Sequence, residues 1–501
     1  MWIDALAINQ TDIAERNAQV SKMRTMYSLA ESTVIWLGPM DDDPKDEVMS
    51  SAVNLAMVYS LVAPEAYNEM IADLDEDRPL FTLTMLETLR NCPYWNRVWV
   101  VQEIMFSRCI WLVYGTDIAP YPDMESFYNS TSVALEERYR KSQLPPVYLA
   151  LAVLLHGKAV GIPKCGAAHR QEYLTLNRWM RGVDTKGATE PRDIVFAFAG
   201  CFEPKTRDLI EVDYSRGLGE VLVDMTLLLI NDATSLDPIL MGEGVLEQEP
   251  AVPSWLWIPK SIAFRQKDQH KRHRNVFSWS LERTGRPAGV LPFVADYDAK
   301  EKTLRVKGKL CFVVRSKATP FIPQDFDPLA SSDEVLAKHL KLFSILVQPT
   351  LNALKLRPES PQLEELLPEK SNFKLWHTMS TQLALEDPHW ESIRDRLAGY
   401  RLFCDFLALR SVFICTQSLP VQGESHDRPG KEETIYGFGP MNMAPGDYIC
   451  AIRGCSLPLI LRQVGQYYRI IGSAKVPAIM RGETVKADED GEEEAEDFFL
   501  K

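Results

Sequence analysis

Short apolar runs and one longer amphipathic run alternate in the first 40 residues of the chain. Residues 2–8 and 33–37 are apolar or β-branched, and each run ends at a turn sequence. Between them, apolar residues recur every three or four positions from Asp12 to Ala30, which predicts a helix. Asp12 followed by Glu15 predicts a capping box at its start. The segment therefore predicts a strand, a helix and a strand, that is, a βαβ unit with two parallel strands.

Helical and extended patterns continue along the rest of the chain. Two helical patterns lie between residues 47 and 91, and residues 108–114 predict a strand. Residues 126–231 have a mainly helical pattern. Residues 304–314 are strand-like, and short apolar runs separated by turn residues fill 410–480, a spacing typical of a small antiparallel barrel.

These patterns predict an α/β fold followed by a helical region and a small C-terminal antiparallel β barrel with a helical insertion. The boundaries that we expect are 1–125 for the α/β domain, 126–255 for the helical region, 256–330 for a linker and the first β strands, 331–409 for the helical insertion, 410–486 for the barrel and 487–501 for an acidic, disordered tail.

The charge of the chain argues against a nucleic-acid partner. The formal net charge is −14, and eight acidic residues crowd the segment 488–497, so the remaining body is only mildly acidic. An acidic body repels a phosphate backbone. The one basic stretch, 267–274, is short and contains Asp268, and we interpret it as a solvated loop.

Cysteine usage and hydropathy indicate a cytoplasmic protein. The nine cysteines are odd in number and none has C-x-x-C spacing, while Cys311 and Cys450 lie inside apolar runs. This pattern fits buried thiols in a reducing compartment and argues against a disulfide framework or a zinc site. No signal peptide is visible, and the longest apolar stretch, 221–230, is too short to span a bilayer and contains Asp224.

Several long motifs resemble those of the fungal heterokaryon-incompatibility (HET) domain family, and they occur in the family's order. They are the segment WIDALAINQTDIAERNAQVSKMRTMYSLAESTVIWLG, the segment PYWNRVWVVQE, Thr189–Asp193 with Asp213–Ser215, Pro253–Trp255, and GFGPMNMAPGDYICAIRGCSLPLILR. The resemblance implies a protein of self/non-self recognition that promotes cell death, through association of its HET domain with protein partners or with itself.

The chain departs from the family's pattern in two ways. Members usually carry an upstream strand that ends in a Ser-Tyr-x-Trp-Gly type motif, which would have to precede Met1, and they carry Cys where this chain has Ala7. Loss of a central strand would leave ladder groups unpaired and apolar surface open. We expect either a truncated gene model or a defective recognition domain.

HET domains in turn resemble Toll/interleukin-1 receptor (TIR) domains, which implies a flavodoxin-like parallel sheet with ligands at the carboxyl ends of its strands. Some TIR domains cleave NAD with a glutamate in a Trp-Cys-x-x-Glu motif, and Trp99 and Glu103 have the same spacing here. A carboxylate stabilises the positive charge that develops on the ribose. The resemblance therefore implies Glu103 as the catalytic residue, with Trp99 as a wall of its pocket. Two further binding candidates come from the sequence itself: Asp4 as a residue that lines the same crevice, and Arg16 as a partner for a carboxylate or a ligand phosphate.

Each of these residues also has a structural interpretation. Glu103 and Trp99 are equally compatible with helix packing, with a partner such as Arg97 for the carboxylate. Asp4 fits a role in the turn that follows it, and Arg16 fits a surface ion pair. We interpret Trp36, Trp95 and Trp99 as core residues and Pro191-Arg192-Asp193 as a structural turn that holds a loop.

Three functions stay open from the sequence: an incompatibility effector that acts by association, an NAD-cleaving hydrolase centred on Glu103, and an inactive, degenerate family member. The histidines show no metal-ligand spacing, and no P-loop or G-x-S-x-G motif occurs. We therefore expect no metal and no required cofactor, with NAD as the substrate in the enzymatic alternative.

Overall fold

The structure is a computed structural model of the 501-residue chain. It describes residues 3–40, 44–77, 81–121, most of 127–135, 173–183, 186–240, 252–259, 293–317, 410–417, 435–440, 442–474, 476, 479 and 495–501. The chain divides into two compact units, Met1–Met225 and Thr226–Lys501. The predicted helical insertion at 331–409 lies outside the described residues, and the finer domain boundaries stay predictions.

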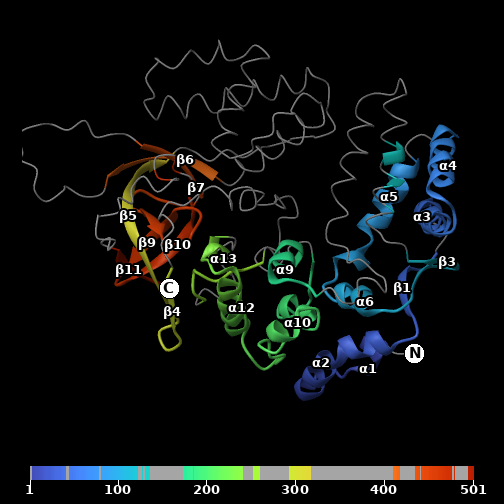
Figure 1. The fold of residues 1–501 in the computed structure, drawn as a ribbon, viewed down its shortest axis with the longest axis horizontal. Coiled ribbons are helices and arrows are strands. Elements are labelled where there is room, and N and C mark those ends of the chain that lie inside the picture. The colour runs from blue at the N-terminus through green and yellow to red at the C-terminus, as the bar shows by residue number, and fades with distance from the viewer. Residues whose placement is uncertain are drawn as a thin grey trace, which may run out of the picture. The chain divides into compact units, whose positions relative to one another are not determined.

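The first unit combines helices with a small sheet (Figure 1). Its elements are α1 (Asp4–Ala7), α2 (Ile13–Leu29), β1 (Thr33–Gly38), α3 (Pro44–Leu61), α4 (Pro64–Asp77), α5 (Phe81–Asn91), the 3-10 helix η1 (Pro93–Asn96), α6 (Val100–Phe106), β2 (Ile110–Tyr114), β3 (Asp117–Pro120), α9 (Leu176–Val183), α10 (Asp193–Ala199), α11 (Pro204–Arg207) and the start of α12 (Leu218–Ala233).

The sheet of this unit is three-stranded and mixed. β1 pairs with β2 in parallel, and β2 pairs with β3 antiparallel. One face carries Ile35, Leu112 and Ala119, which are buried in a core that also contains residues of α3 and α5. An α/β fold is thus confirmed for this part of the chain.

The predicted opening strand is wrong. Residues Asp4–Ala7 form the one-turn helix α1, and Leu6 stands 83% exposed. The parallel partner of β1 is β2, more than 70 positions later, so residues 2–37 do not form the predicted βαβ unit. A short apolar run does not distinguish helix from strand by periodicity, and Ala5, Leu6 and Ala7 are strong helix formers. Asp4 therefore lies on a helix and not on a strand.

The predicted second helix is confirmed as α2. Asp12 is its N-cap and accepts a hydrogen bond from the Glu15 amide at 3.0 Å. The Glu15 carboxylate reaches back to the amide of Asn9 at 3.1 Å, one turn further than a capping box requires. Val20 and Met23 are the buried residues of α2, and Asn17 and Arg24 of the same helix hydrogen-bond to residues far along the chain.

The second unit contains an eight-stranded sheet. Its strands are β4 (Ala295–Asp298), β5 (Thr303–Lys317), β6 (Arg410–Gln417), β7 (Ile435–Pro440), β8 (Tyr448–Ile452), β9 (Leu459–Val464), β10 (Tyr467–Ser473) and β11 (Glu496–Leu500), and its described helices are the rest of α12 and α13 (Asp237–Leu240). The strands predicted at 304–314 and across 410–480 are confirmed. β5 is central, because it pairs with β4, β6, β8 and β11.

The acidic tail is not disordered throughout its length. Residues 496–500 form β11, which pairs antiparallel with β5 and in parallel with β10, so the strand path returns to β5. Phe498 and Leu500 are buried, whereas Glu496, Asp497 and Phe499 are exposed. This alternation is that of a half-buried strand, and the preceding run of acidic residues concealed it in the sequence.

Candidate functional site

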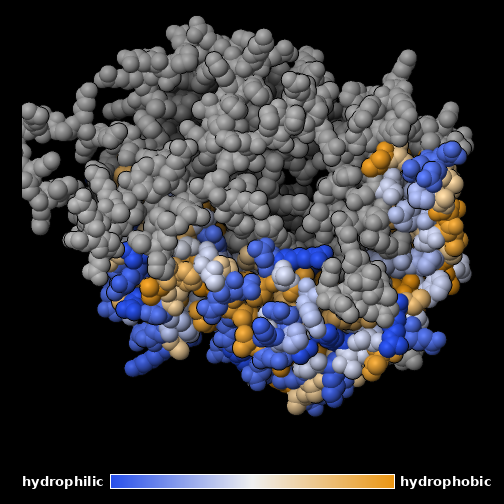
Figure 2. All heavy atoms as spheres, viewed as in Figure 1, coloured by the Kyte–Doolittle hydropathy of each residue, from blue (hydrophilic) through white to orange (hydrophobic). Residues whose placement is uncertain are grey.

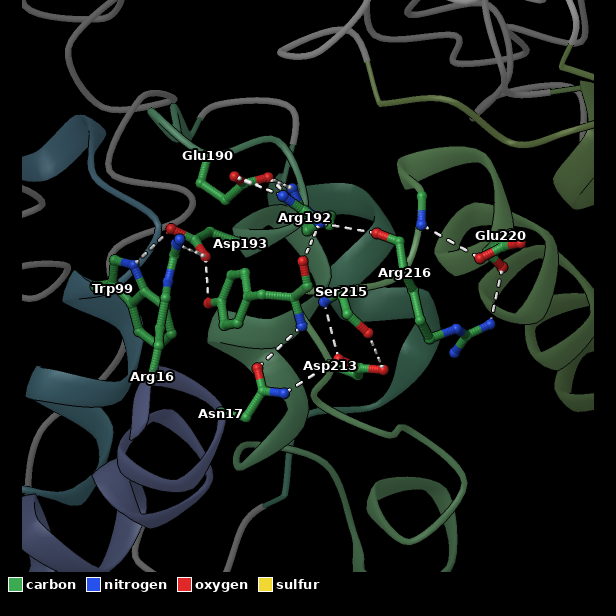
Figure 3. Close-up of polar contacts among 12 residues, drawn as sticks. Arg16, Asn17, Trp99, Glu190, Arg192, Asp193, Asp213, Ser215, Arg216 and Glu220 are labelled. Carbon is green, nitrogen blue, oxygen red and sulfur yellow. Dashed lines mark hydrogen bonds and ion pairs between the residues drawn. The ribbon is translucent and has the colours of Figure 1, made fainter. Parts of the chain in front are cut away.

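Arg16 and Trp99, two of the predicted site residues, meet at a buried aspartate that lies 94 positions after Trp99 in the chain. The indole Nε1 of Trp99 donates to Oδ2 of Asp193 at 3.1 Å. Nη2 of Arg16 lies 3.5 Å from Oδ1 of Asp193, and the hydroxyl of Tyr214 donates to the same oxygen at 2.5 Å. We call these four residues the Asp193 cluster (Figure 3).

Each member of the Asp193 cluster comes from a different element. Arg16 lies in the first turns of α2, Trp99 is the N-cap of α6, and Asp193 opens α10. Tyr214 lies in the loop before α12. The cluster therefore joins the two helices α2 and α6 to a segment that follows them by roughly a hundred residues or more.

Burial and charge set the ionisation of the cluster. Burial raises the pKa of the Asp193 carboxyl, while the donors Tyr214 and Trp99 and the charge of Arg16 limit that rise. Burial and the neighbouring carboxylate of Asp193 raise the pKa of the Tyr214 phenol. The Arg16 guanidinium also lies 3.6 Å from the centre of the Tyr214 ring. This is a cation–π contact, which stabilises the positive charge of Arg16.

Arg192 holds the loop that carries Tyr214. Its guanidinium pairs with Glu190 at 2.7 Å and donates to the backbone carbonyls of Tyr214 and Arg216 at 2.5 and 2.8 Å. Burial raises the pKa of Glu190, but the hydrogen bonds and charge of Arg192 outweigh this and leave that pKa below its usual range. The predicted structural role of the Pro191-Arg192-Asp193 turn is confirmed.

Further polar contacts attach α2 to the same segment. The Asn17 side chain donates to Asp213 at 3.1 Å and accepts from the Tyr214 amide at 2.9 Å. Nη1 of Arg24 donates to the carbonyl of Gly200 at 3.1 Å. These hydrogen bonds act together with the burial of Val20 and Met23 to hold α2 within the unit.

Glu103 lies in a different polar environment. It is 8% exposed, in a helix whose neighbours Val100, Gln102 and Ile104 are also buried. Its carboxylate accepts a hydrogen bond from the Tyr94 hydroxyl at 2.5 Å, and burial together with the charge of Glu103 raises the pKa of Tyr94. The predicted alternative of a structural glutamate on a packed helix therefore has a definite partner in Tyr94.

A buried lysine lies against the same turn. Nζ of Lys186 donates to the carbonyl of Trp95 at 2.8 Å, and burial lowers the pKa of Lys186 to about 8. The backbone of the next residue, Gly187, pairs with Arg97 as an isolated bridge. The η1 turn that carries Tyr94 is thus fixed from the later part of the unit.

The sequence predicted Arg16 and Trp99 as site residues, but it gave Asp193, which binds both, only a place in a structural turn. Asp213 and Tyr214 entered only as part of a motif, and Asn17 was not predicted to have a role. Their partners lie 94 to 197 positions away, so no local spacing reveals the cluster. Asp4 lies on α1, and its predicted place beside the other site residues rested on the strand that is wrong.

Comparison with known families identifies a domain in the N-terminal part of the chain. The sequence model of the family described as "Heterokaryon incompatibility protein (HET)" matches residues 1–103. Residues 1–103 are a HET domain. The domain as matched contains α2, β1 and Trp99 and ends at Glu103, whereas Asp193 and Tyr214 lie beyond it.

A curated relative matches over a shorter length. It is "Heterokaryon incompatibility protein 6, OR allele" of Neurospora crassa, which is 51% identical over 59 residues. The matched segment covers 12% of this chain and 8% of the relative, so the chain spans a small part of that protein's length. No solved structure matches the chain.

Among the described residues, no helix combines the length and apolar character needed to cross a bilayer. No group of three or more His, Cys, Asp or Glu side chains in the same residues has the arrangement of a metal site.

Proposed function

We propose that this chain is a heterokaryon-incompatibility protein that acts in self/non-self recognition, promotes cell death, and does so by association of its HET domain. The match of residues 1–103 to the HET family and the similarity to a curated incompatibility protein support the role. The geometry of the domain supports association as the mode of action.

The observation that carries this proposal is the internal use of the polar side chains. Arg16 and Trp99 each bind Asp193, and Glu103 binds Tyr94, all within the first unit. Side chains held this way stabilise the arrangement of helices, which is what a recognition surface needs. The HET domain presents apolar side chains to solvent instead, among them Val34 and Trp36 of β1.

Inducible expression of the full chain in a filamentous fungus tests the proposal. We expect growth arrest and uptake of a vital dye after induction. Asp193→Ala, which removes the acceptor of the cluster, should weaken the arrest by loosening α2. Asp208→Ala is the matched control, because Asp208 is an exposed aspartate whose side chain pairs, among the described residues, with its neighbour Arg207. Normal growth at full protein level would contradict the proposal and favour an inactive family member.

The alternative is NAD cleavage at Glu103. The spacing of Trp99 and Glu103 supports this alternative. The burial of Glu103 and its hydrogen bond with Tyr94 favour a structural role for the carboxylate instead. An NAD-consumption assay on the purified chain tests it, with Glu103→Ala as the control. Turnover that disappears in Glu103→Ala would favour the hydrolase over association as the mode of action.

A further inference from the structure

Three side chains of α2 contact one later part of the chain, residues 190–216, which we call the α2-binding segment. They are the side chains of Arg16, Asn17 and Arg24. Their helical spacing places them on one face of α2, together with the buried Val20. Figure 3 shows Arg16 and Asn17 directed from α2 toward this segment. This face of α2 therefore binds residues that lie beyond the matched HET domain.

The opposite face of α2 reaches solvent. Ala18, Thr25 and Leu29 lie on that face and are exposed. The surface of the first unit around α2 mixes hydrophilic and hydrophobic residues (Figure 2). In the described structure, the contacts that hold α2 are thus concentrated on one face of the helix.

The α2-binding segment is held in shape by contacts of its own. The Arg192 guanidinium pairs with Glu190 and donates to the backbone carbonyls of Tyr214 and Arg216. The centre of the Phe196 ring lies 5.0 Å from that of the Tyr214 ring. None of these contacts involves α2, so the shape that they give the segment does not depend on α2.

Gly200 lets the end of α10 approach α2 closely. A Cβ added at this position would lie 3.1 Å from Cβ of Arg24 and 3.3 Å from Oε1 of Gln102. Both separations are shorter than ordinary van der Waals contact, so a larger residue would displace α2 or the Gln102 side chain. The missing side chain is therefore part of the fit between α2 and the α2-binding segment.

The core beneath the sheet uses other contacts. Among the described residues, its buried members come from residues 35–135. α6 contributes Val100 and Ile104 to that core, whereas its Trp99 and Gln102 donate to the α2-binding segment. The contacts between α2 and the segment are thus separate from those of the core, and breaking them removes none of the core's own contacts.

We propose that α2 is a switch helix, which docks on the α2-binding segment and undocks from it as one unit while the core of residues 35–135 stays folded. One helix carries all three side chains, so their contacts form and break together. Each of these polar contacts has a modest net free energy, so undocking costs less than unfolding of the whole unit.

The switch helix regulates the association proposed above, and it rests on that function for its biological meaning. The docked form is the one that associates, because it holds α2 in a single arrangement. A partner that binds the docked form better than the undocked form shifts the equilibrium toward docking. Residues beyond the matched HET domain thereby control the arrangement of a helix within it.

Hydrogen exchange of the wild-type full chain at increasing urea concentration tests the proposal without any variant. The free energy of opening and its urea dependence should both be smaller for the amides of α2 than for those of β2 and α10. Equal values for α2 and β2 would overturn the proposal, because α2 would then open only with the whole unit.

Two variants test which contacts dock the helix. Asn17→Ala removes the hydrogen bonds to residues 213 and 214, and α2 should exchange roughly tenfold faster or more, with β2 and α10 unchanged. Alanine is the better helix former, so faster exchange reports lost docking and not lost helix propensity. Gly200→Ala should act in the same direction. Gly217→Ala is its matched control, because nothing lies within 4 Å of the added Cβ, and it should leave α2 unchanged.

The outcomes that contradict the switch helix are distinct from those that contradict the proposed function. Unchanged exchange of α2 in both variants, or equal acceleration of β2, would refute local undocking. A wild type that arrests growth although α2 opens only with the whole unit leaves the function intact and overturns the switch. Local opening of α2 in a chain that does not arrest growth does the opposite.

Discussion

At the scale of single residues, the buried carboxylate of Asp193 joins α2 and α6 to the later part of the first unit. Tyr214→Phe removes the hydroxyl that donates to Asp193 and keeps the ring under Arg16. We expect the free energy of unfolding of the first unit to fall by about 1.5–3 kcal/mol, the usual cost of losing a hydrogen bond to a charged group. Urea unfolding measures it. Tyr173→Phe, at an exposed tyrosine, should change it little, and equal effects of both variants would contradict the cluster's role.

Lys186 gives the unit a specific dependence on pH. Its pKa is lowered to about 8 in the folded chain, so between that value and its ordinary 10.5 the unfolded chain binds more protons. Stability should therefore rise with pH through this window, by on the order of 3 kcal/mol for an ideal two-state group. Lys186→Met should be more stable than the wild type at pH 7 and lack this rise. Unfolding curves from pH 7 to 10 measure both, and parallel profiles would refute the assignment.

The turn between β2 and β3 requires glycine at position 115. Its φ is +53°, and an added Cβ would lie 2.6 Å from Cβ of Met40. Gly115→Ala should destabilise the β2–β3 turn by more than about 1 kcal/mol, since both the backbone and the contact are unfavourable. Gly217→Ala is the control, because nothing lies within 4 Å of its added Cβ. Thermal unfolding compares them, and similar stabilities would show that Met40 moves aside.

At the scale of elements, the sequence was sufficient where local chemistry decides the structure. Asp12 and Glu15 predicted the start of α2, and short apolar runs bounded by turn residues predicted β1, β2 and the strands β5 to β10. The sequence was not sufficient where contacts with distant residues decide the structure. The run at 2–8 has the composition of either a strand or a helix, and Trp36 is apolar yet exposed because no described element covers its face. The Asp193 cluster joins elements that are distant in sequence, which no pattern of spacing encodes.

The N-cap of α2 can be tested at this scale. Asp12→Ala removes the acceptor for the Glu15 amide, and we expect a loss of about 1 kcal/mol in helix stability. Because α2 carries Arg16 and Asn17, the loss should also appear as faster hydrogen exchange across α2. Glu31→Ala, at an exposed acidic residue after the helix, should leave exchange unchanged. Exchange in α2 that does not respond to Asp12→Ala would mean that tertiary contacts alone hold the helix.

At the scale of the whole molecule, the two compact units predict two separable unfolding transitions. β11, the C-terminal strand, belongs to the second unit, where Phe498 is buried opposite Val306 of β5 and Phe499 is 40% exposed. Phe498→Ala should lower the stability of the second unit by about 3–5 kcal/mol, the range for a buried phenylalanine. Phe499→Ala is a control one position away in the same strand and should cost much less, because that side chain stands on the exposed face.

Differential scanning calorimetry of the full chain distinguishes the outcomes. Phe498→Ala should shift one transition to lower temperature and leave the transition of the HET-containing unit in place, because the contacts that it removes lie within residues 226–501. The Tyr214→Phe variant should shift the other transition. If either variant moved both transitions together, the units would unfold cooperatively, and the C-terminal strand would then contribute to the stability of the HET domain.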